Sequence, residues 1–315
     1  MGRDFNPVLW DDQLKDDVRK LVALAIAEDL GTLGDITTQA LVPQHALGKA
    51  VMRSRHVGVV AGLVAVPLIA SMIDTRLSWY PLLRDGDPIG EVNTALGTIT
   101  GPVVSILMAE RKILNLIGRL CGIATLTRCY INEISGTKAR IYDTRKTLLG
   151  WRRLEKYAVQ CGGGRSHRTG LFDAILIKDN HLAFGASDDV GTCGRYAYTP
   201  AQAVHKAREW CNNYVHASGQ SQTLPPLIEI EVDSLEQLAE VLPESPDIVM
   251  LDNMTPDRIR EAVIMRDQAG VPTELEASGG VNLKTVRAIA ETGVERISVG
   301  ALTHSAISLD IGLDY

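Results

Sequence analysis

Residues 227–252, LIEIEVDSLEQLAEVLPESPDIVMLD, hold the pattern that decides the fold. Two apolar runs, at 227–232 and 247–252, flank a segment whose leucines recur at helical spacing over 235–242. Apolar strands alternating with helices are typical of a parallel sheet that helices cover on both faces. The stretch therefore predicts a strand, a helix and a second strand in series.

The same alternation begins near Lys138 and continues through most of the second half of the chain. The remaining predicted strands are ARIYD (139–143), AILIK (174–178), ELEAS (274–278) and RISVG (296–300), and the remaining helices lie near 151–160, 255–267 and 284–291. Six strands fall short of the eight in a complete barrel. We predict an incomplete, six- to seven-stranded α/β barrel.

The first third of the chain has a different texture. A helical stripe covers about 16–30, short β-like runs follow at 48–53 and 56–60, and a helical pattern returns at 103–134 with a second piece after Gly122. These elements predict a separate α/β domain with a sandwich architecture.

We therefore predict two domains. An N-terminal α/β sandwich domain covers 1–135 and leaves room for completion by C-terminal residues, and the α/β barrel domain covers 136–305. The segment near 185–226 is longer than an ordinary connection between a strand and a helix, so it is interpreted as an insertion.

Composition excludes several classes of protein. The 315 residues carry a net charge of −6, which disfavours general nucleic-acid binding because phosphate contacts need a cationic surface. Five cysteines without a CxxC pair disfavour a zinc ribbon or a disulfide framework. The longest uncharged run, 57–73, is broken by Gly58, Gly62 and Pro67, so it predicts a strand, a turn and a short helix and not a membrane span. We expect a cytoplasmic protein that contacts neither nucleic acid nor membrane.

Reactive or glycine-rich residues follow every predicted strand of the barrel. Because the carboxyl ends of barrel strands converge on one face, we expect these residues to form a site. They are Thr144, Arg145, Lys146, Lys178, Glu231, Asp252, Ser278, Gly279, Gly280 and Gly300.

Positive charge is concentrated between 140 and 168, where eight basic residues face only two acidic ones. We assign Arg152, Arg153 and Lys156 to the solvated face of a helix. By contrast, Arg145, Lys146, His167 and Arg168 are flanked by strand ends and glycines, which favours a pocket for anions.

Three glycine segments fit such a pocket. Gly162–Gly164 allows close backbone approach just before His167 and Arg168. The runs 278–280 and 300–304 resemble the last two phosphate loops of a barrel, whose backbone N–H groups hold a phosphate.

Glu231 and Asp252 are acids beside these loops, which favours binding of Mg²⁺ or of sugar hydroxyls. The alternative is a buried ion pair with Lys146 or Lys178. Cys161 has no base arranged around it and is interpreted as structural. For His181, a packing role is as well supported as a catalytic one.

Together these stretches resemble the quinolinate phosphoribosyltransferases, also called nicotinate-nucleotide pyrophosphorylases (carboxylating). The matching segments are EDLGTLGDITT (28–38), AERKILNLIGRLCGIATLT (109–127), DTRKT (143–147), RRLEKYAVQCGGGRSHRTGLFDAILIKDNH (152–181), IEIEV (228–232), IVMLDNM (248–254), LEASGGV (275–281) and ISVGALTHS (297–305).

The resemblance implies an enzyme that converts quinolinate and phosphoribosyl pyrophosphate, with Mg²⁺, to nicotinate mononucleotide, CO₂ and pyrophosphate in NAD biosynthesis. It also implies a homodimer or a multiple of dimers, up to a hexamer, with the active site at the subunit interface.

The resemblance assigns roles to individual residues. Arg111, from the neighbouring subunit, and Thr144, Arg145, His167, Arg168 and Lys178 resemble the quinolinate pocket. Lys146, Glu231 and Asp252 resemble the catalytic groups around the ribose, with Glu231 and Asp252 binding Mg²⁺ directly or through water or substrate. The phosphoribosyl pyrophosphate set adds Lys178, Ser278, Gly279, Gly280, Gly300 and His304.

The chain departs from the family pattern at a few uncharged positions. Leu148 and Leu149 stand in place of Thr-Pro, Trp151 in place of Leu and Ser166 in place of Asn, and there is one extra residue at 32–33. None of these removes a charged group.

Three alternatives remain at this point. The related molybdenum-transport-associated family shares the fold and several motifs. A catalytically silent anion-binding protein could use the same scaffold. A Schiff-base aldolase using Lys178 or Lys146 would need an amine of lowered pKa, and borohydride trapping tests for it.

Overall fold

The computed structural model describes residues 3–185, 198–217 and 225–315. The chain divides into two compact units, each built from separate stretches of sequence. Unit 1 comprises 1–6, 132–145 and 167–299, and unit 2 comprises 7–131, 146–166 and 300–315. The predicted domain boundary between residues 135 and 136 stays a prediction. The two spatial units do not correspond to two consecutive stretches of sequence, because the chain passes between them several times.

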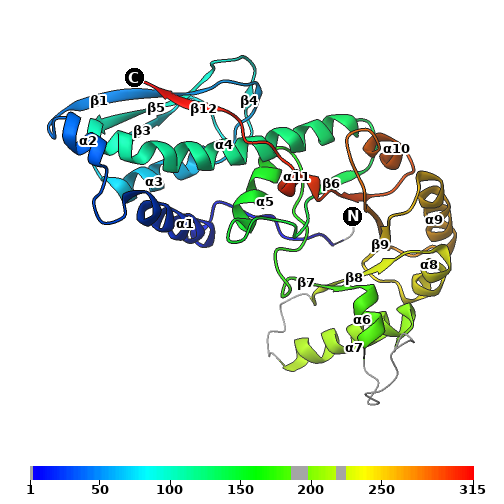
Figure 1. The fold of residues 1–315 in the computed structure, drawn as a ribbon. Coiled ribbons are helices and arrows are strands. Elements are labelled where there is room, and N and C mark those ends of the chain that lie inside the picture. The colour runs from blue at the N-terminus through cyan, green and yellow to red at the C-terminus, as the bar shows by residue number, and fades with distance from the viewer. Residues whose placement is uncertain (1–2, 186–197, 218–224) are drawn as a thin grey trace. The chain divides into compact units, whose positions relative to one another are not determined.

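Unit 1 is built on a six-stranded parallel sheet (Figure 1). Its strands are β6 (Arg140–Tyr142), β7 (Ala174–Ile177), β8 (Leu227–Val232), β9 (Ile248–Asp252), β10 (Glu274–Ser278) and β11 (Arg296–Ser298). Their spatial order is β6-β11-β10-β9-β8-β7, which is the circular order of an α/β barrel opened between β6 and β7. The predicted incomplete barrel is therefore confirmed.

Helices connect these strands and cover the sheet. They are α6 (Asp179–Phe184), α7 (Pro200–Ala217), α8 (Leu235–Val241), the short 3-10 helix η2 (Leu242–Glu244), α9 (Pro256–Ala269) and α10 (Val286–Ala290). Local chemistry fixes their ends: in α9, the Thr255 side chain accepts from the backbone N–H of Arg258, and Gly270 ends the helix at a φ of 66°. Each helix predicted after β8, β9 and β10 is present.

Unit 2 contains an antiparallel sheet of order β12-β1-β5-β3 and a two-stranded ribbon of β2 and β4. The strands are β1 (Leu47–Ser54), β2 (Gly58–Val59), β3 (Ser78–Pro81), β4 (Pro88–Ile89), β5 (Ala95–Pro102) and β12 (Ile311–Asp314). Leu313, near the C-terminal end of the chain, lies opposite Met52 of β1. The C-terminal residues therefore complete the sheet of this unit.

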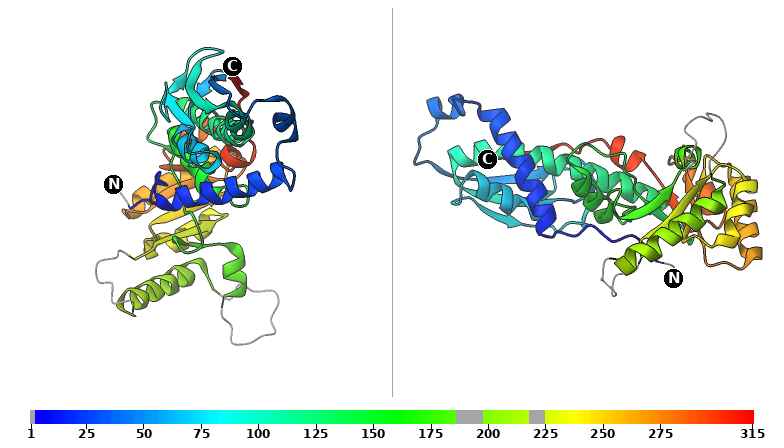
Figure 2. Two further views of the ribbon diagram at one scale, coloured as in Figure 1. Left: turned by 90° about the vertical axis from the view of Figure 1, so that its left-hand side faces the viewer. Right: turned by 90° about the horizontal axis from the view of Figure 1, so that it is seen from below.

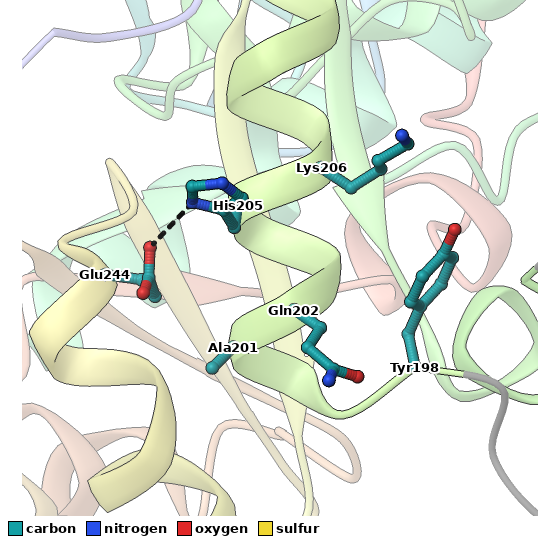
Figure 3. A pocket seen from close by; sticks show the side chains of 6 residues that line it. All are labelled: Tyr198, Ala201, Gln202, His205, Lys206 and Glu244. Atoms are coloured by element: carbon teal, nitrogen blue, oxygen red, sulfur yellow. Dashed lines mark ion pairs between the residues drawn. The ribbon is translucent and has the colours of Figure 1, made fainter.

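The helices of unit 2 include two that follow barrel strands in sequence. The set is α1 (Asp12–Leu30), α2 (Ile36–Leu41), η1 (Leu63–Ala65), α3 (Val66–Ile73), α4 (Val103–Glu133, with its last two residues in unit 1), α5 (Arg152–Cys161) and α11 (Ala301–His304). Figure 2 shows them from two further directions. Because α5 is enclosed within unit 2, Lys156 is fully buried, and its assignment to a solvated face was wrong.

Helix α4 is continuous over 31 residues, so the predicted second piece after Gly122 does not exist. Its glycines serve close packing. A Cβ atom at Gly122 would lie 2.1 Å from the carbonyl oxygen of Ile307, and one at Gly118 would lie 2.8 Å from that of Leu309. The helix therefore accepts the backbone of the segment before β12 directly against its surface.

Two sequence predictions concern less regular regions. The run 57–73 forms β2, η1 and α3, with Gly62 at a φ of 92°, as predicted. Much of the predicted insertion lies outside the described residues, but its helical part is confirmed as α7. None of the helices in the described ranges is long and apolar enough to cross a membrane.

Candidate active site

The carboxyl ends of the parallel strands in unit 1 carry the predicted polar residues at one edge. Asp252 ends β9 and lies opposite Ser278, which ends β10. Glu231, the fifth residue of β8, lies opposite Met250 of β9. Lys178 follows β7 directly. The strand register therefore places these groups on adjacent strands at the edge where barrels bind substrates.

Tight backbone geometry follows β9 and β10. The backbone N–H of Asn253, at a φ of 54°, donates to the carbonyl oxygen of Ser278 at 2.9 Å. A Cβ atom at Gly279, whose φ is 94°, would lie 2.1 Å from Asn253 Oδ1. Only glycine fits this position, which supports the interpretation of 278–280 as a loop that brings its backbone close to another group.

Lys178 and Glu231 form an ion pair in which Nζ donates to Oε2. The Lys178 side chain is 40% exposed and the Glu231 side chain 17% exposed. The pairing with Lys178 that sequence analysis raised as an alternative for Glu231 is therefore present, although the pair is partly exposed and not buried. Both groups stay accessible enough to exchange this contact for a ligand.

Two arginines of unit 1, Arg145 and Arg168, influence each other electrostatically. The Arg168 side chain is buried, and its Nη1 donates to the carbonyl oxygen of Ala174 at 3.3 Å. Burial, followed by the charge of Arg145, lowers the pKa of Arg168 from its ordinary value. The Nε atoms of both arginines are buried and have no hydrogen-bond partner among the described residues. Two mutually repelling guanidinium groups with unused donors are suited to an anion.

His167 is held by contacts on both ring nitrogens. Its Nε2 lies 3.0 Å from Glu229 Oε2 and 3.5 Å from Glu276 Oε1. Its Nδ1 accepts from the backbone N–H of Arg168 at 2.8 Å, and its own backbone N–H donates to Asp143 Oδ1 at 2.9 Å. The ring that sequence analysis assigned to the pocket therefore faces two buried carboxylates in unit 1.

Opposing influences act on the pKa of His167. Burial lowers it, and the charges of Glu229 and Glu276 outweigh burial and raise it to about 10. The bond from the Arg168 N–H to Nδ1 favours the neutral ring, because a proton on Nδ1 would displace that bond. A ring that accepts a hydrogen bond at Nδ1 carries its proton on Nε2, which lies 3.0 Å from Glu229 Oε2.

Unit 2 gathers a second group of predicted residues. A Cβ atom at Gly300 would lie 3.2 Å from Lys146 Cδ and 3.2 Å from His304 Nε2. The Thr303 hydroxyl donates to the backbone carbonyl of Lys146 at 2.8 Å. Lys146, Gly300 and His304 are therefore brought together by the fold of unit 2.

Three further residues considered in the sequence analysis are Arg111, Cys161 and His181. Arg111 lies on α4 with its side chain 69% exposed and its Nη2 3.7 Å from Glu110 Oε1. Burial raises the pKa of the Cys161 thiol to about 12, which agrees with a structural role. His181 is exposed, and its Nδ1 atom accepts from the backbone N–H of Lys178 at 2.9 Å, which caps the start of α6.

Sequence analysis missed a buried network beneath this edge. Glu229, Glu276 and Arg296 are fully buried, although all three lie in predicted strands. Each of these residues lies two or more positions before the end of its strand. Because side chains alternate along a strand, Glu229 lies on the same face as Glu231, and this spacing could have identified Glu229. Sequence analysis considered only the last residues of each strand.

An open parallel barrel with cations, acids and glycine loops at the carboxyl ends of its strands defines an enzyme that acts on small anionic substrates. Residues 123–314 match the family described as "Quinolinate phosphoribosyl transferase, C-terminal domain", and residues 35–121 match the corresponding N-terminal domain. The chain belongs to the quinolinate phosphoribosyltransferase family.

Individual relatives agree along nearly the whole chain. The "Nicotinate-nucleotide pyrophosphorylase [carboxylating]" of Mycobacterium leprae is 40% identical over 301 residues, covering 95% of this chain and 97% of the relative. The chloroplastic protein of that name from Arabidopsis thaliana is 34% identical, covering 94% of this chain and 82% of the relative. The structure of the nicotinate-nucleotide pyrophosphorylase from Francisella tularensis matches with a TM-score of 0.85 and 35% identity over 99% of both chains.

The activity of the chain is that of a carboxylating nicotinate-nucleotide pyrophosphorylase, in the de novo synthesis of NAD. This result favours the predicted function over the molybdenum-transport-associated family, the silent binder and the aldolase.

Proposed function

We propose that unit 1 binds the two carboxylates of quinolinate through its cationic pocket. The residues are Thr144, Arg145, His167, Arg168 and Lys178. The observation that carries this assignment is the pair of buried Nε donors on Arg145 and Arg168, which have no partner in the described part of the chain. Quinolinate is a dianion, and several cations in a partly dry pocket fix its ring orientation.

Within this pocket the ring nitrogen is turned toward C1 of the ribose. The nitrogen lone pair forms the new bond to C1 as the bond from C1 to the pyrophosphate oxygen breaks, and pyrophosphate leaves with that electron pair. Positive charge develops on the sugar, and the carboxylates of Glu231 and Asp252 stabilise it. Lys146, Glu231 and Asp252 are the proposed catalytic residues.

Decarboxylation follows from the charge of the product. The ring nitrogen is now a pyridinium, and it accepts the electron pair released when the 2-carboxylate leaves as CO₂. A proton then takes the place of the carboxylate on the ring. Neither a Schiff base nor an organic cofactor is needed for this step.

The proposed binding set for phosphoribosyl pyrophosphate consists of residues at strand ends and in glycine loops. We assign to it Lys146, Lys178, Glu231, Asp252, Ser278, Gly279, Gly280, Gly300 and His304. The close approach at Gly279 and the cluster of Lys146, Gly300 and His304 in unit 2 support these roles. Backbone N–H groups and a lysine charge are the usual partners of phosphate.

The donor atoms at the barrel edge fit Mg²⁺. Glu231 and Asp252 offer carboxylate oxygens, the ligands that this hard cation prefers, and Asn253 Nδ2 orients Asp252 by donating to its Oδ2 at 2.7 Å. These two acids would hold the ion directly or through water or substrate. When bound, Mg²⁺ supplies charge neutralisation for the pyrophosphate group.

Selectivity against nicotinate follows from the same pocket. Nicotinate lacks the 2-carboxylate, so its binding would leave buried cations without a partner. A site built for a polar group can reject an analogue that lacks it by roughly 10⁴-fold.

We further propose a homodimer or a multiple of dimers, up to a hexamer, in which Arg111 enters the partner's active site. The exposed Arg111 side chain on α4 supports this role. Cytoplasmic localisation is proposed from the sequence features alone.

Product analysis tests the proposed pocket. Purified protein is incubated with phosphoribosyl pyrophosphate, Mg²⁺ and either quinolinate or nicotinate. We expect nicotinate mononucleotide and CO₂ from quinolinate, and no nucleotide from nicotinate. Equal turnover of the two acids would contradict a pocket that requires both carboxylates.

A further inference from the structure

Residues 3–6 belong to unit 1, although the chain enters unit 2 at residue 7. Arg3 donates to the carbonyl oxygen of Pro225 at 2.6 Å, and Phe5 is part of a buried cluster with Tyr142, Ala174, Leu227 and Ile248. This short segment therefore fills part of the core of the open barrel, a position that its place in the sequence does not predict.

Phe5 packs directly against the ring of His167. The two ring centroids are 4.3 Å apart and the ring planes are inclined by 32°. The Arg296 guanidinium lies 5.1 Å from the Phe5 centroid and 3.9 Å from the Tyr142 centroid. Phe5 is thus in contact with both the imidazole of His167 and the Arg296 guanidinium.

A chain of ion pairs links Asp4 to the same histidine. Arg296 donates to Asp4 Oδ1 at 3.0 Å and to Glu276 Oε2 at 3.0 Å. The other oxygen of Glu276 lies 3.5 Å from His167 Nε2, and Glu229 lies 3.0 Å from it. Arg296 is fully buried, so each carboxylate that it contacts is held in one position.

His167 in turn fixes the position of the Arg168 backbone. Its Nδ1 accepts the backbone N–H of Arg168, so the imidazole fixes the backbone from which the guanidinium extends. The hydrogen bond from the backbone N–H of His167 to Asp143 holds the same turn from the other side. Arg168 is therefore placed by a fixed histidine, and the histidine by Phe5, Glu229 and Glu276.

We propose that Phe5 and Asp4 are positioning residues for quinolinate binding, acting through His167 on the Arg168 guanidinium. The proposal rests on the assignment of Arg168 to the quinolinate pocket. It adds an N-terminal segment, outside the loops that follow the barrel strands, to the groups that determine affinity for this substrate. The binding of phosphoribosyl pyrophosphate does not depend on this chain of contacts.

The central test replaces Phe5 by Leu, which keeps an apolar side chain but removes the ring. We expect Phe5→Leu to raise the KM for quinolinate about fivefold, the effect of losing a favourable ring contact. The KM for phosphoribosyl pyrophosphate stays within about twofold of the original value. Phe5→Tyr retains the ring and restores the KM for quinolinate. Asp4→Asn, which removes the charge beside Arg296, raises the same KM.

A double-mutant cycle separates positioning from general packing. In a His167→Asn background, we expect Phe5→Leu to raise the KM for quinolinate no further, because its route to Arg168 is already lost. Ile259→Ala serves as a matched control, since Ile259 is buried on α9 in the same unit. This control lowers thermal stability without a selective change in the KM for quinolinate.

The outcomes are distinct. Parallel rises of both KM values, or additive effects in the cycle, would show that Phe5 only supports folding and would overturn the proposal. An unchanged KM for quinolinate in Phe5→Leu would overturn it as well. Arg145→Ala is measured beside these variants: if it too leaves quinolinate use intact, the failure lies in the proposed pocket itself.

Discussion

The ammonium group of Lys178 donates to the carboxylate of Glu231 and joins the carboxyl ends of β7 and β8. Each residue has a proposed role in substrate binding, so substrate must reorganise this pair. The contact keeps two opposite charges in place at a partly exposed edge, where an ion pair is worth little by itself. We therefore expect the pair to contribute more to substrate binding and catalysis than to stability.

Glu231→Gln tests whether this carboxylate acts in the reaction. The amide keeps the shape and removes the charge that stabilises the developing cation on the ribose. We expect kcat to fall about 100-fold, the usual effect of losing one such electrostatic group, with a smaller change in either KM. Steady-state kinetics at saturating substrates measure this. An unchanged kcat with lowered thermal stability would instead identify Glu231 as a structural partner of Lys178.

Arg145→Ala tests the cationic pocket. Removal of a guanidinium that pairs with a buried carboxylate costs several kcal/mol, so we expect kcat/KM for quinolinate to fall at least about 100-fold. The fold stays intact by circular dichroism and thermal melting. Arg260→Ala is the control, since Arg260 is a half-exposed arginine of α9 that pairs with Asp257 of the same helix. Near-normal turnover in Arg145→Ala would refute the role of this residue.

Asp252→Asn tests the proposed Mg²⁺ ligand. The amide is a weaker ligand for a hard cation, so we expect the Mg²⁺ concentration for half-maximal rate to rise about tenfold. Titration of the rate with Mg²⁺, after removal of metal by a chelator, measures the change. If the metal titration of the variant matches that of the parent, Asp252 does not contribute to metal binding.

Gly122→Ala tests the close packing along α4. The added methyl group would lie 2.1 Å from the carbonyl oxygen of Ile307, a backbone atom that cannot rotate away. We expect a loss of about 1 to 3 kcal/mol in the free energy of unfolding, measured by denaturant titration. Gly90→Ala is the control, because its Cβ atom would meet nothing within 4 Å. Equal stability of the two variants would contradict the packing argument.

Much of the fold could be predicted from sequence because the barrel strands are short, apolar and regularly spaced. The strands and helices from 227 to 300 were found by periodicity alone, and the strand ends then located Lys178, Glu231 and Asp252. Periodicity reports local structure, however, and contains no information on which unit encloses a helix. The burial of Lys156 in α5 was missed for this reason.

The site was predicted less completely than the fold. Charge sorting found Arg145 and Arg168, since cations near glycines are visible in a linear sequence. It could not find the contact of Phe5 with His167, which joins residues 162 positions apart. The surroundings of a buried side chain depend on tertiary packing, and a single sequence shows only its own neighbours.

The interleaved course of the chain has a consequence for biosynthesis. During translation, Met52 and its strand β1 emerge early, but their partner β12 is made only at 311–314. At roughly 5 to 20 residues per second, one edge of this sheet waits on the order of ten seconds or more. Asp4 waits similarly for Arg296. Unit 1 is complete only at residue 299 and unit 2 only at residue 315, so both remain unfinished for most of translation. We therefore expect ribosome-bound fragments to need protection from aggregation.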